Sequence, residues 1–386
     1  RKEMANHKTS LIFRKMRDSS KLYLNPKEYT KLKRIKMKFL ILLLSPLFLF
    51  AHEGDIDWKG AEPSTISDYR LKPSRTIYKN LRSGNIGASF FIEKNQKINL
   101  IPSIEIYLED QKVTITANNK GQPLEFCKRR PNGLVKGTFK LKNKYFNIKQ
   151  RKTYQVPVNL ECGRMTSFIF NHDQFSGQAL GIYDVAMTAV KKFKKLAILD
   201  FWRKKIDIVF PGRGDYYSWG TINITKGHFW DVVGHELGHA LYDQAKIGRL
   251  EGGSHKIDKC YSKGLALSEG WASFFSAWLK VKLDDPDAKF EFMVARRAPI
   301  EFENIPSDVC PGENNEWRVT GFLWDLIDTH EDLEDSVKMP FKDFWKFTLN
   351  KNFRKTSDIA KGLIKKNFDP LLMQIIWKQN FLKDLI

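Results

Sequence analysis

The sequence has few cysteines, and no two of them stand in the CxxC spacing that structural zinc sites use. The four are Cys127, Cys162, Cys260 and Cys310. Because a zinc ribbon needs such closely spaced thiolates, that class of structural site is excluded. An even number of cysteines in an exported chain favours disulfides, with buried free thiols as the alternative. Of the three possible pairings, Cys127–Cys162 with Cys260–Cys310 keeps each bridge inside one apparent domain.

The sequence also lacks an apolar run long enough to cross a bilayer comfortably. Its run from Phe39 to Ala51 covers 13 residues and is interrupted by Pro46. Preceded by Met37 and a lysine, this run is typical of a secretory signal peptide that is cleaved after Ala51. We therefore expect residues 37–51 to be a signal peptide. The mature chain is expected to be secreted, periplasmic or extracellular, without a stable membrane span.

The residues before Met37 are basic and unpatterned, and they begin with arginine rather than methionine. We interpret residues 1–36 as a non-native or unstructured extension, with Met37 as the true start. A cytoplasmic tail in front of a signal anchor is the alternative. Residues 52–73, which contain several glycines and prolines, are expected to form a linker.

Negative charge is scarce relative to positive charge, since the formal net charge is +21. The first 51 residues carry 13 Lys and Arg against 3 Asp and Glu, so about half of the excess precedes the expected mature chain. No basic run interleaved with aromatic residues is present, and we expect no nucleic-acid partner. The remaining basic surface suits anionic polymers or surfaces, or simply lysine-rich solvated faces.

Two kinds of pattern divide the rest of the chain. From 74 to 165, short segments rich in β-branched and aromatic residues alternate with turn signals, which predicts an all-β, sandwich-like domain. From 166 to 386, helical apolar spacing dominates, with short strand-like segments at 206–211 and 221–225. The expected fold class is therefore α+β. The expected helices cover residues 177–205, 228–246, 265–283, 317–330, 340–349, 356–366 and 369–384.

The segment most informative about chemistry is HELGH, residues 235–239, within a predicted helix. His235 and His239 are four residues apart, so the helix turns by about 400° and rises by about 6 Å between them. Both imidazoles therefore leave the same face and can bind one metal ion. Glu236 lies about 100° further round the axis, where it can take a proton from an attacking water molecule. The alternative is that both histidines belong to an ordinary amphipathic helix.

A catalytic zinc ion usually takes three protein ligands, so a third one is expected. The metzincin pattern would place a histidine where Ala245 stands, and that pattern is rejected. Glu269 is the only acid in the apolar, aromatic stretch from Leu265 to Leu279. A carboxylate there is costly to bury without a cation, which makes Glu269 the candidate third ligand. A salt bridge to lysine or arginine is the alternative.

HELGH followed by SEGWA around Glu269 resembles the gluzincin group of zinc peptidases, which combine HExxH with a downstream glutamate. The group includes the thermolysin-like peptidases and a large family of zinc aminopeptidases. The resemblance covers residues 228–283 and implies a zincin-like metallopeptidase domain at 166–386. It also implies that Zn²⁺ is bound by His235, His239 and Glu269, with Glu236 as the catalytic base.

Two departures keep the choice of family open. The 29 residues between His239 and Glu269 exceed the spacing of either of those families, and the GxMEN motif of the aminopeptidases is absent. The resemblance therefore assigns the group, and both endopeptidase and exopeptidase activity remain open.

Other residues are candidates for orienting the ligands or for stabilising an oxyanion. Metal-bound histidines usually donate their second N–H to a carboxylate or carbonyl. Asp325, on the predicted helix 317–330, is the preferred partner, and Asp243 follows His239 by one turn. A donor for developing negative charge is also expected. The candidates are Arg318, Tyr217 and His228.

Three glycines, Gly234, Gly238 and Gly270, stand beside the expected ligands although glycine is unfavourable in a helix by about 1 kcal/mol relative to alanine. They indicate either the close approach of another backbone or the substrate, or tight helix packing.

Together these features predict a secreted zinc metallopeptidase that acts on a protein or peptide. The substrate is expected to lie extended beside the strand at 221–225. A zinc hydrolase of non-peptide amides is one alternative, because the motif describes the metal and the water but not the substrate. A non-enzymatic extracellular binding or adhesion protein on the same fold is another, which the predicted β domain and the basic surface would suit.

Overall fold

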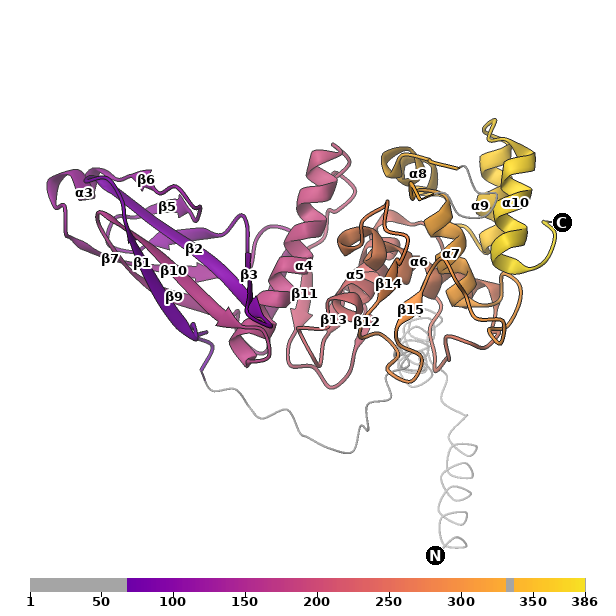
Figure 1. Cartoon of the computed structure of the whole chain (residues 1–386), viewed down its shortest axis with the longest axis horizontal. Coiled ribbons are helices and arrows are strands. Elements are labelled where there is room, and N and C mark those ends of the chain that lie inside the picture. The colour runs from indigo at the N-terminus through magenta and orange to yellow at the C-terminus, as the bar shows by residue number, and fades with distance from the viewer. Residues whose placement is uncertain (1–67, 331–336, 386) are drawn as a thin grey trace, which may run out of the picture. The chain divides into compact units, whose positions relative to one another are not determined.

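The computed structural model describes residues 68–330 and 337–385 (Figure 1). The expected extension at 1–36, the signal peptide at 37–51 and most of the linker at 52–73 lie outside the described residues. Within the described ranges, no helix combines the length and the apolar character that a membrane crossing requires. Several sheets and helices occur together in this part of the chain, which confirms the α+β class.

Two sheets form the N-terminal part, and their inner faces share a core. The first has the order β1 (Arg75–Asn80), β10 (Arg164–Asn171), β2 (Asn85–Lys94) and β3 (Lys97–Leu100), with β6 (Gln122–Pro123) paired to β2. The second has the order β5 (Val113–Thr116), β4 (Glu105–Leu108), β7 (Leu134–Lys140) and β9 (Gln155–Glu161). The ring centroid of Phe90 on β2 lies 5.5 Å from that of Phe139 on β7. Along β9 every second residue is buried, as expected for a strand with one face in a core.

The N-terminal part is not purely β, because the short helix α3 (Glu125–Arg129) follows β6. Cys127 on α3 is bonded to Cys162, which follows β9 directly. The second disulfide joins Cys260 to Cys310. The neighbour pairing expected from the sequence is therefore confirmed.

The expected domain boundary at residue 165 falls inside strand β10. In addition, β8 (Phe146–Lys149) leaves the N-terminal sheets and pairs in parallel with β11 (Ile206–Val209). The two predicted domains are therefore linked by a shared sheet. Because β8 and β11 are almost 60 residues apart in the sequence, no local pattern indicates that they pair.

A third sheet carries the strand that was expected to bind substrate. Its order is β12 (Tyr216–Ser218), β13 (Thr221–Asn223), β11 and β8. The expectation that the segment 221–225 offers a free edge is wrong, because β13 pairs with β11 on one side and with β12 on the other. Within the described residues, the sheet ends at β12 on this side and at β8 on the other, and the outer side of β12 carries no paired strand.

Helices make up most of the remaining chain, as predicted, but several of them begin and end at other residues than the sequence analysis predicted. The first, α4 (Phe175–Lys195), is shorter than the expected 177–205, because Ala197 adopts a left-handed conformation with φ 55° that stops the helix. The others are α5 (Trp230–Ala245), α6 (Lys263–Lys280), α7 (Glu316–Asp325), α8 (Phe341–Thr348), α9 (Thr356–Ile364) and α10 (Pro370–Phe381), with the small hairpin of β14 (Lys289–Phe290) and β15 (Ile300–Glu301) before α7.

Side-chain caps stand at the starts of α6, α7 and α10, where Asp369 caps α10 by accepting from the backbone N–H groups of Leu371 and Leu372. Ser262 accepts a hydrogen bond from the backbone N–H of Leu265 at the start of α6, and Asn315 accepts one from Arg318 at the start of α7. Each cap satisfies a backbone donor that the first turn leaves without an intrahelical partner.

The three glycines beside the expected ligands allow α5, α6 and α7 to pack closely. A Cβ at Gly238 on α5 would lie 2.8 Å from the backbone of Ala272 on α6. A Cβ at Gly234 would collide with Ser276 on α6, and one at Gly270 would lie 2.6 Å from Val319 on α7. Neighbouring helices therefore account for all three glycines, through the close approach of another backbone at Gly238 and through helix packing at Gly234 and Gly270.

We predict that Gly238→Ala destabilises the fold by about 1–3 kcal/mol, because the added methyl group meets backbone that cannot turn aside. Urea unfolding would measure the change. The control is Gly362→Ala on α9, where the added group meets the edge of the Phe347 ring. Equal stability of Gly238→Ala and the parent would contradict the close packing of α5 and α6.

Candidate metal centre

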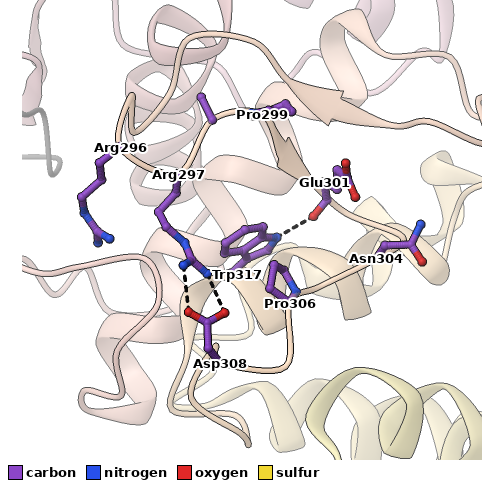
Figure 2. Close-up of a pocket in the computed structure, with 9 residues that line it drawn as sticks. Arg296, Arg297, Pro299, Glu301, Asn304, Pro306, Asp308 and Trp317 are labelled. Atoms are coloured by element: carbon purple, nitrogen blue, oxygen red, sulfur yellow. Dashed lines mark hydrogen bonds and ion pairs between the residues drawn. The ribbon is translucent and has the colours of Figure 1, made fainter.

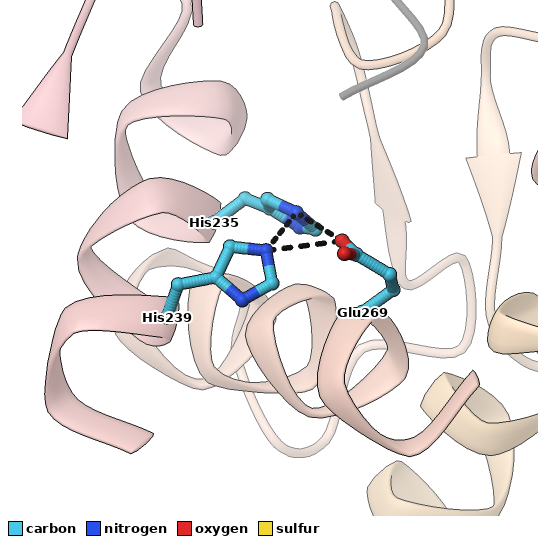
Figure 3. Close-up of side chains that lie close together, drawn as sticks. All are labelled: His235, His239 and Glu269. Carbon is cyan, nitrogen blue, oxygen red and sulfur yellow. Dashed lines mark hydrogen bonds and ion pairs between the residues drawn. The ribbon is translucent and has the colours of Figure 1, made fainter. Parts of the chain in front are cut away.

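Three potential metal ligands converge between α5 and α6 (Figure 3). His235 and His239 project from one face of α5, and Glu269 faces them from α6. The Nε2 atoms of the two histidines lie 3.0 Å apart. The Oε2 atom of Glu269 lies 3.1 Å from Nε2 of His235 and 3.0 Å from Nε2 of His239. The helix thus places both imidazoles one turn apart on the side that α6 covers.

This donor set fits a metal ion. Ligand atoms at about 2.0–2.2 Å from a tetrahedral zinc ion lie about 3.3–3.5 Å from one another, and the observed triangle is only slightly smaller. Two imidazole nitrogens and a carboxylate oxygen in mutual contact have too few protons to satisfy every pair by hydrogen bonds. A divalent cation among the three would interact favourably with all of them.

The cluster is withdrawn from solvent. His235, His239 and Glu269 are 0%, 1% and 2% exposed. Burial lowers the pKa of His235 to about 4, so its imidazole is neutral near pH 7, which is the form that binds a metal ion. Burial alone would raise the pKa of Glu269, but the surrounding histidines, led by His239 and His255, hold it well below its ordinary value. Glu269 is therefore an anion.

A serine orients the first histidine. Nδ1 of His235 lies 3.1 Å from the Oγ atom of Ser273. When Nδ1–H donates to this hydroxyl, the Nε2 lone pair is left facing the cluster. Ser273 was not among the sequence-based candidates, although its position four residues after Glu269 places both on one face of α6.

Glu236 is buried beside the cluster without a hydrogen-bonding partner of good geometry. Both of its oxygens lack such a partner among the described residues, and the residue is 1% exposed. Burial raises its pKa well above the ordinary value, and the charge of Glu269 adds to the increase. The backbone N–H of Tyr217 on β12 acts weakly in the opposite direction. A carboxylate with a raised pKa next to three potential ligands has the properties of a proton acceptor.

A third histidine and a second glutamate extend the cluster. Nδ1 of His255 lies 2.7 Å from Oε2 of Glu316, at the start of α7. Nε2 of the same ring lies 3.6 Å from Oε2 of Glu269. Both side chains are buried, at 1% and 5% exposure. The sequence analysis missed this pair because His255 lies in an irregular connection and Glu316 stands outside any motif.

The remaining candidates have partners of their own. The hydroxyl of Tyr217 donates to Asp243 at 2.7 Å, so two candidates contact each other. Burial raises the pKa of Tyr217, and the hydrogen bond to Asp243 adds to the effect. The side chain of Asp325, the preferred partner of a ligating histidine, accepts a hydrogen bond from Asn380 on α10.

Arg318 is bound to backbone carbonyls rather than directed at a cavity. Its Nε donates to Cys310, and its terminal nitrogens donate to Val309 and Asn380, at 2.7–3.0 Å. The ring of His228 contacts His172, Phe229 and Phe292. Burial lowers the pKa of His228, which favours its neutral form.

Two pockets lie outside the cluster. Figure 2 shows the smaller, with a volume of about 350 Å³, where Arg297 pairs with Asp308 through two hydrogen bonds of 2.8 and 2.9 Å and packs over Trp317. The larger has a volume of about 960 Å³ and is lined in part by Tyr217, Asp243 and the almost fully exposed Trp219. Because Tyr217 belongs to β12, the larger pocket adjoins the edge strand beside Glu236.

No protein-family model, no curated protein and no solved structure matches this chain.

We predict that Glu236→Gln makes the metal-free protein more stable at neutral pH, because the uncharged amide avoids the cost of a buried carboxylate. A carboxyl group whose pKa is raised by folding contributes stability below its ordinary pKa near 4.5, and this contribution is lost as pH rises through the folded pKa. The advantage of the variant should therefore grow with pH above about 4.5 and reach about 1–3 kcal/mol at pH 8. Urea unfolding with a chelator present would measure it. A variant no more stable than the parent at any pH would contradict the burial of an unpaired Glu236.

Proposed function

We propose that this protein is a zinc-dependent metallopeptidase with a zincin-like domain of the gluzincin type. The observation that carries the proposal is the convergence of His235, His239 and Glu269, with the buried carboxylate of Glu236 next to them. Two imidazole nitrogens and one carboxylate oxygen are the usual protein ligands of a catalytic zinc ion. A set of three leaves a further position for water or substrate.

His235, His239 and Glu269 would hold the zinc ion, which would supply polarisation of the scissile carbonyl and a lower pKa for a water molecule. Glu236 takes the proton from the attacking water and passes it to the leaving amine. The raised pKa of Glu236 suits this role, because a base must release the proton that it has taken. Ser273 keeps the ring of His235 in the orientation that presents Nε2.

The proposed substrate is an extended polypeptide that adds to the outer edge of β12. Three features support this edge: it carries no paired strand within the described residues, β12 contacts α5, and the backbone N–H of Tyr217 acts on Glu236. Backbone pairing with an edge strand holds a peptide extended without demanding a particular sequence. The exposed Trp219 follows this strand and offers an apolar contact at its end.

We also propose that the protein acts outside the cytoplasm. The two disulfides support this location, because such bonds persist in oxidising compartments. The apolar segment at 37–51 provides the corresponding export signal.

Metal content would test the site directly. We expect about one zinc ion per parent chain by elemental mass spectrometry of the purified protein. Glu269→Ala removes the only carboxylate ligand of the set, so it should lower the zinc content or weaken zinc binding strongly. A folded parent that takes up no zinc after resupply would refute the proposal.

Activity would test the role of the base. Glu236→Gln should keep the zinc ion and lose at least about 100-fold in peptide hydrolysis, because the amide cannot accept the proton of water. A mixture of peptides of varied length and sequence, followed by mass spectrometry, would locate the cleaved bonds. Chelation should abolish cleavage in the parent, and zinc should restore it. Full activity of Glu236→Gln would exclude Glu236 as the base. If the parent hydrolysed only non-peptide amides, the proposed peptide substrate would be wrong and the alternative of a zinc amide hydrolase would take its place.

A further inference from the structure

The turn between β12 and β13 carries a tryptophan that contributes no buried contact to the fold. Ser218 pairs with Thr221, so Trp219 and Gly220 alone form the turn. Both adopt left-handed backbone conformations, with φ 48° and 85°. Such two-residue turns favour Asn-Gly, because a bulky residue is strained in this conformation. Trp219 is nonetheless 98% exposed, so no packing offsets the strain. A strained and exposed aromatic residue indicates a role in binding rather than in folding.

This turn borders the larger pocket, whose volume is about 960 Å³. Its other walls come from β11, the segment directly before it and the C-terminal end of α5. Cationic side chains are prominent in the lining, and within the described residues none of them forms an ion pair. They are Arg203, Lys204, Lys205 and Lys246.

The carboxylates of the same lining do not balance these cations. Asp207 is paired with Lys149 at 2.7 Å, and Asp243 accepts a hydrogen bond from Tyr217 at 2.7 Å. Asp200 is the third acid of the lining among the described residues. With Lys149 included, five cations therefore face three carboxylates. A concave pocket with an excess of positive charge favours an anionic ligand.

Main-chain contacts hold two of the lysines in place. The side chain of Gln244 on α5 accepts from the N–H of Lys204 at 3.0 Å and donates to its carbonyl at 2.9 Å. The carbonyl of Lys246 accepts from the N–H of Asn352 at 3.0 Å. Because these bonds use the backbone, the ammonium groups remain available to a ligand. Replacing either lysine side chain therefore leaves the anchoring bonds intact.

The pocket lies along the edge where the proposed substrate binds. Tyr217, whose backbone N–H acts on Glu236, precedes Trp219 by two residues, or about 7 Å of extended strand. A polypeptide that pairs with β12 beside Glu236 would therefore pass Trp219 and the cations about two or three residues from the cleaved bond.

We propose that this pocket selects polypeptides with acidic side chains, which the cations bind while Trp219 contacts the apolar part of the chain. The inference rests on the proposed peptidase function and names its substrate class. A flat anionic membrane would also suit an exposed tryptophan among lysines. The concave shape of the pocket and its place beside the edge strand favour the polypeptide.

The test uses the full-length protein loaded with Zn²⁺ and a mixture of randomised peptides. Mass spectrometry of the products should show acidic residues enriched two or three residues to one side of the cleaved bonds. Two matched peptides would then differ only in Glu or Gln at these positions. The acidic peptide should have at least about 10-fold higher kcat/KM, and added salt should reduce the difference.

Variants separate the charges from the aromatic contact. The double variant Lys204→Gln, Lys205→Gln should reduce the preference for the acidic peptide by about 3- to 10-fold, as expected for two exposed ion pairs. Trp219→Ala should raise KM for both peptides alike, because its contact is apolar. Lys378→Gln is the matched control, since Lys378 is an exposed lysine on α10 that does not line the pocket.

The outcomes separate this inference from the proposed function. Equal kcat/KM for the two peptides would overturn the acidic selection and leave the peptidase standing. Binding to vesicles of phosphatidylglycerol and phosphatidylcholine that the double variant abolishes, without a preference between the peptides, would replace the polypeptide by a membrane. If no peptide is cleaved, the proposed function fails. Fluorescence anisotropy of the two labelled peptides then tests the pocket alone, and equal binding of both would overturn it.

Discussion

The close packing of α5 against α6 determines where every donor of the candidate metal centre lies. His235 and His239 come from one helix and Glu269 from the other, so the distance between the helices sets the distance between the ligand atoms. Glycine at position 238 lets the two backbones approach until a single added methyl group would collide with Ala272. Helices with larger side chains at this point would be further apart. The glycines therefore lower the helix propensity of α5 and α6, but they allow the two helices to pack closely. Close packing brings the three ligand atoms near enough to one another to contact a single ion.

A second layer of contacts keeps the donors in orientation. Ser273 is on the same helix as Glu269 and bonds to His235, so α6 supplies both a ligand and the partner of a ligand. Glu316 on α7 lies 2.7 Å from Nδ1 of His255, the third histidine beside the cluster. The Cys260–Cys310 disulfide joins the segment after His255 to the segment before α7. Arg318 binds the carbonyl of Cys310, so a residue considered for oxyanion stabilisation holds this support in place.

The sequence predicted those parts of the site that depend on local periodicity. The spacing of HELGH is sufficient to place two histidines on one helix face, and Glu269 was recognisable as an isolated acid in an apolar helix. The two disulfides followed from the order of the cysteines along the chain. Ser273 was within reach of the same reasoning, because it shares a helix face with Glu269.

The parts that sequence reasoning missed depend on contacts between distant segments. The segment 221–225 is internal because β13 pairs with both β11 and β12, and this leaves β12 at that edge of the sheet. His255 lies outside regular structure, so no period indicates which way its ring points. For Arg318, residue type alone suggested an anion-binding role, whereas the carbonyls that surround it are brought together only by the fold.

Electrostatics explain why the metal centre and the fold depend on each other. Burial keeps His235 neutral and makes ionised Glu236 unfavourable, while Glu269 stays an anion through the histidines around it. Without a cation, the interior therefore holds several acceptor atoms in contact and too few protons to pair them. A divalent ion bound by His235, His239 and Glu269 would remove this conflict, and its binding energy would then contribute to the stability of the α5–α6 pair. Glu236 gains no ligand bond from that ion, and its desolvation cost persists. Because packing alone would favour a neutral side chain at this position, the buried carboxylate of Glu236 supports its proposed role as the catalytic base.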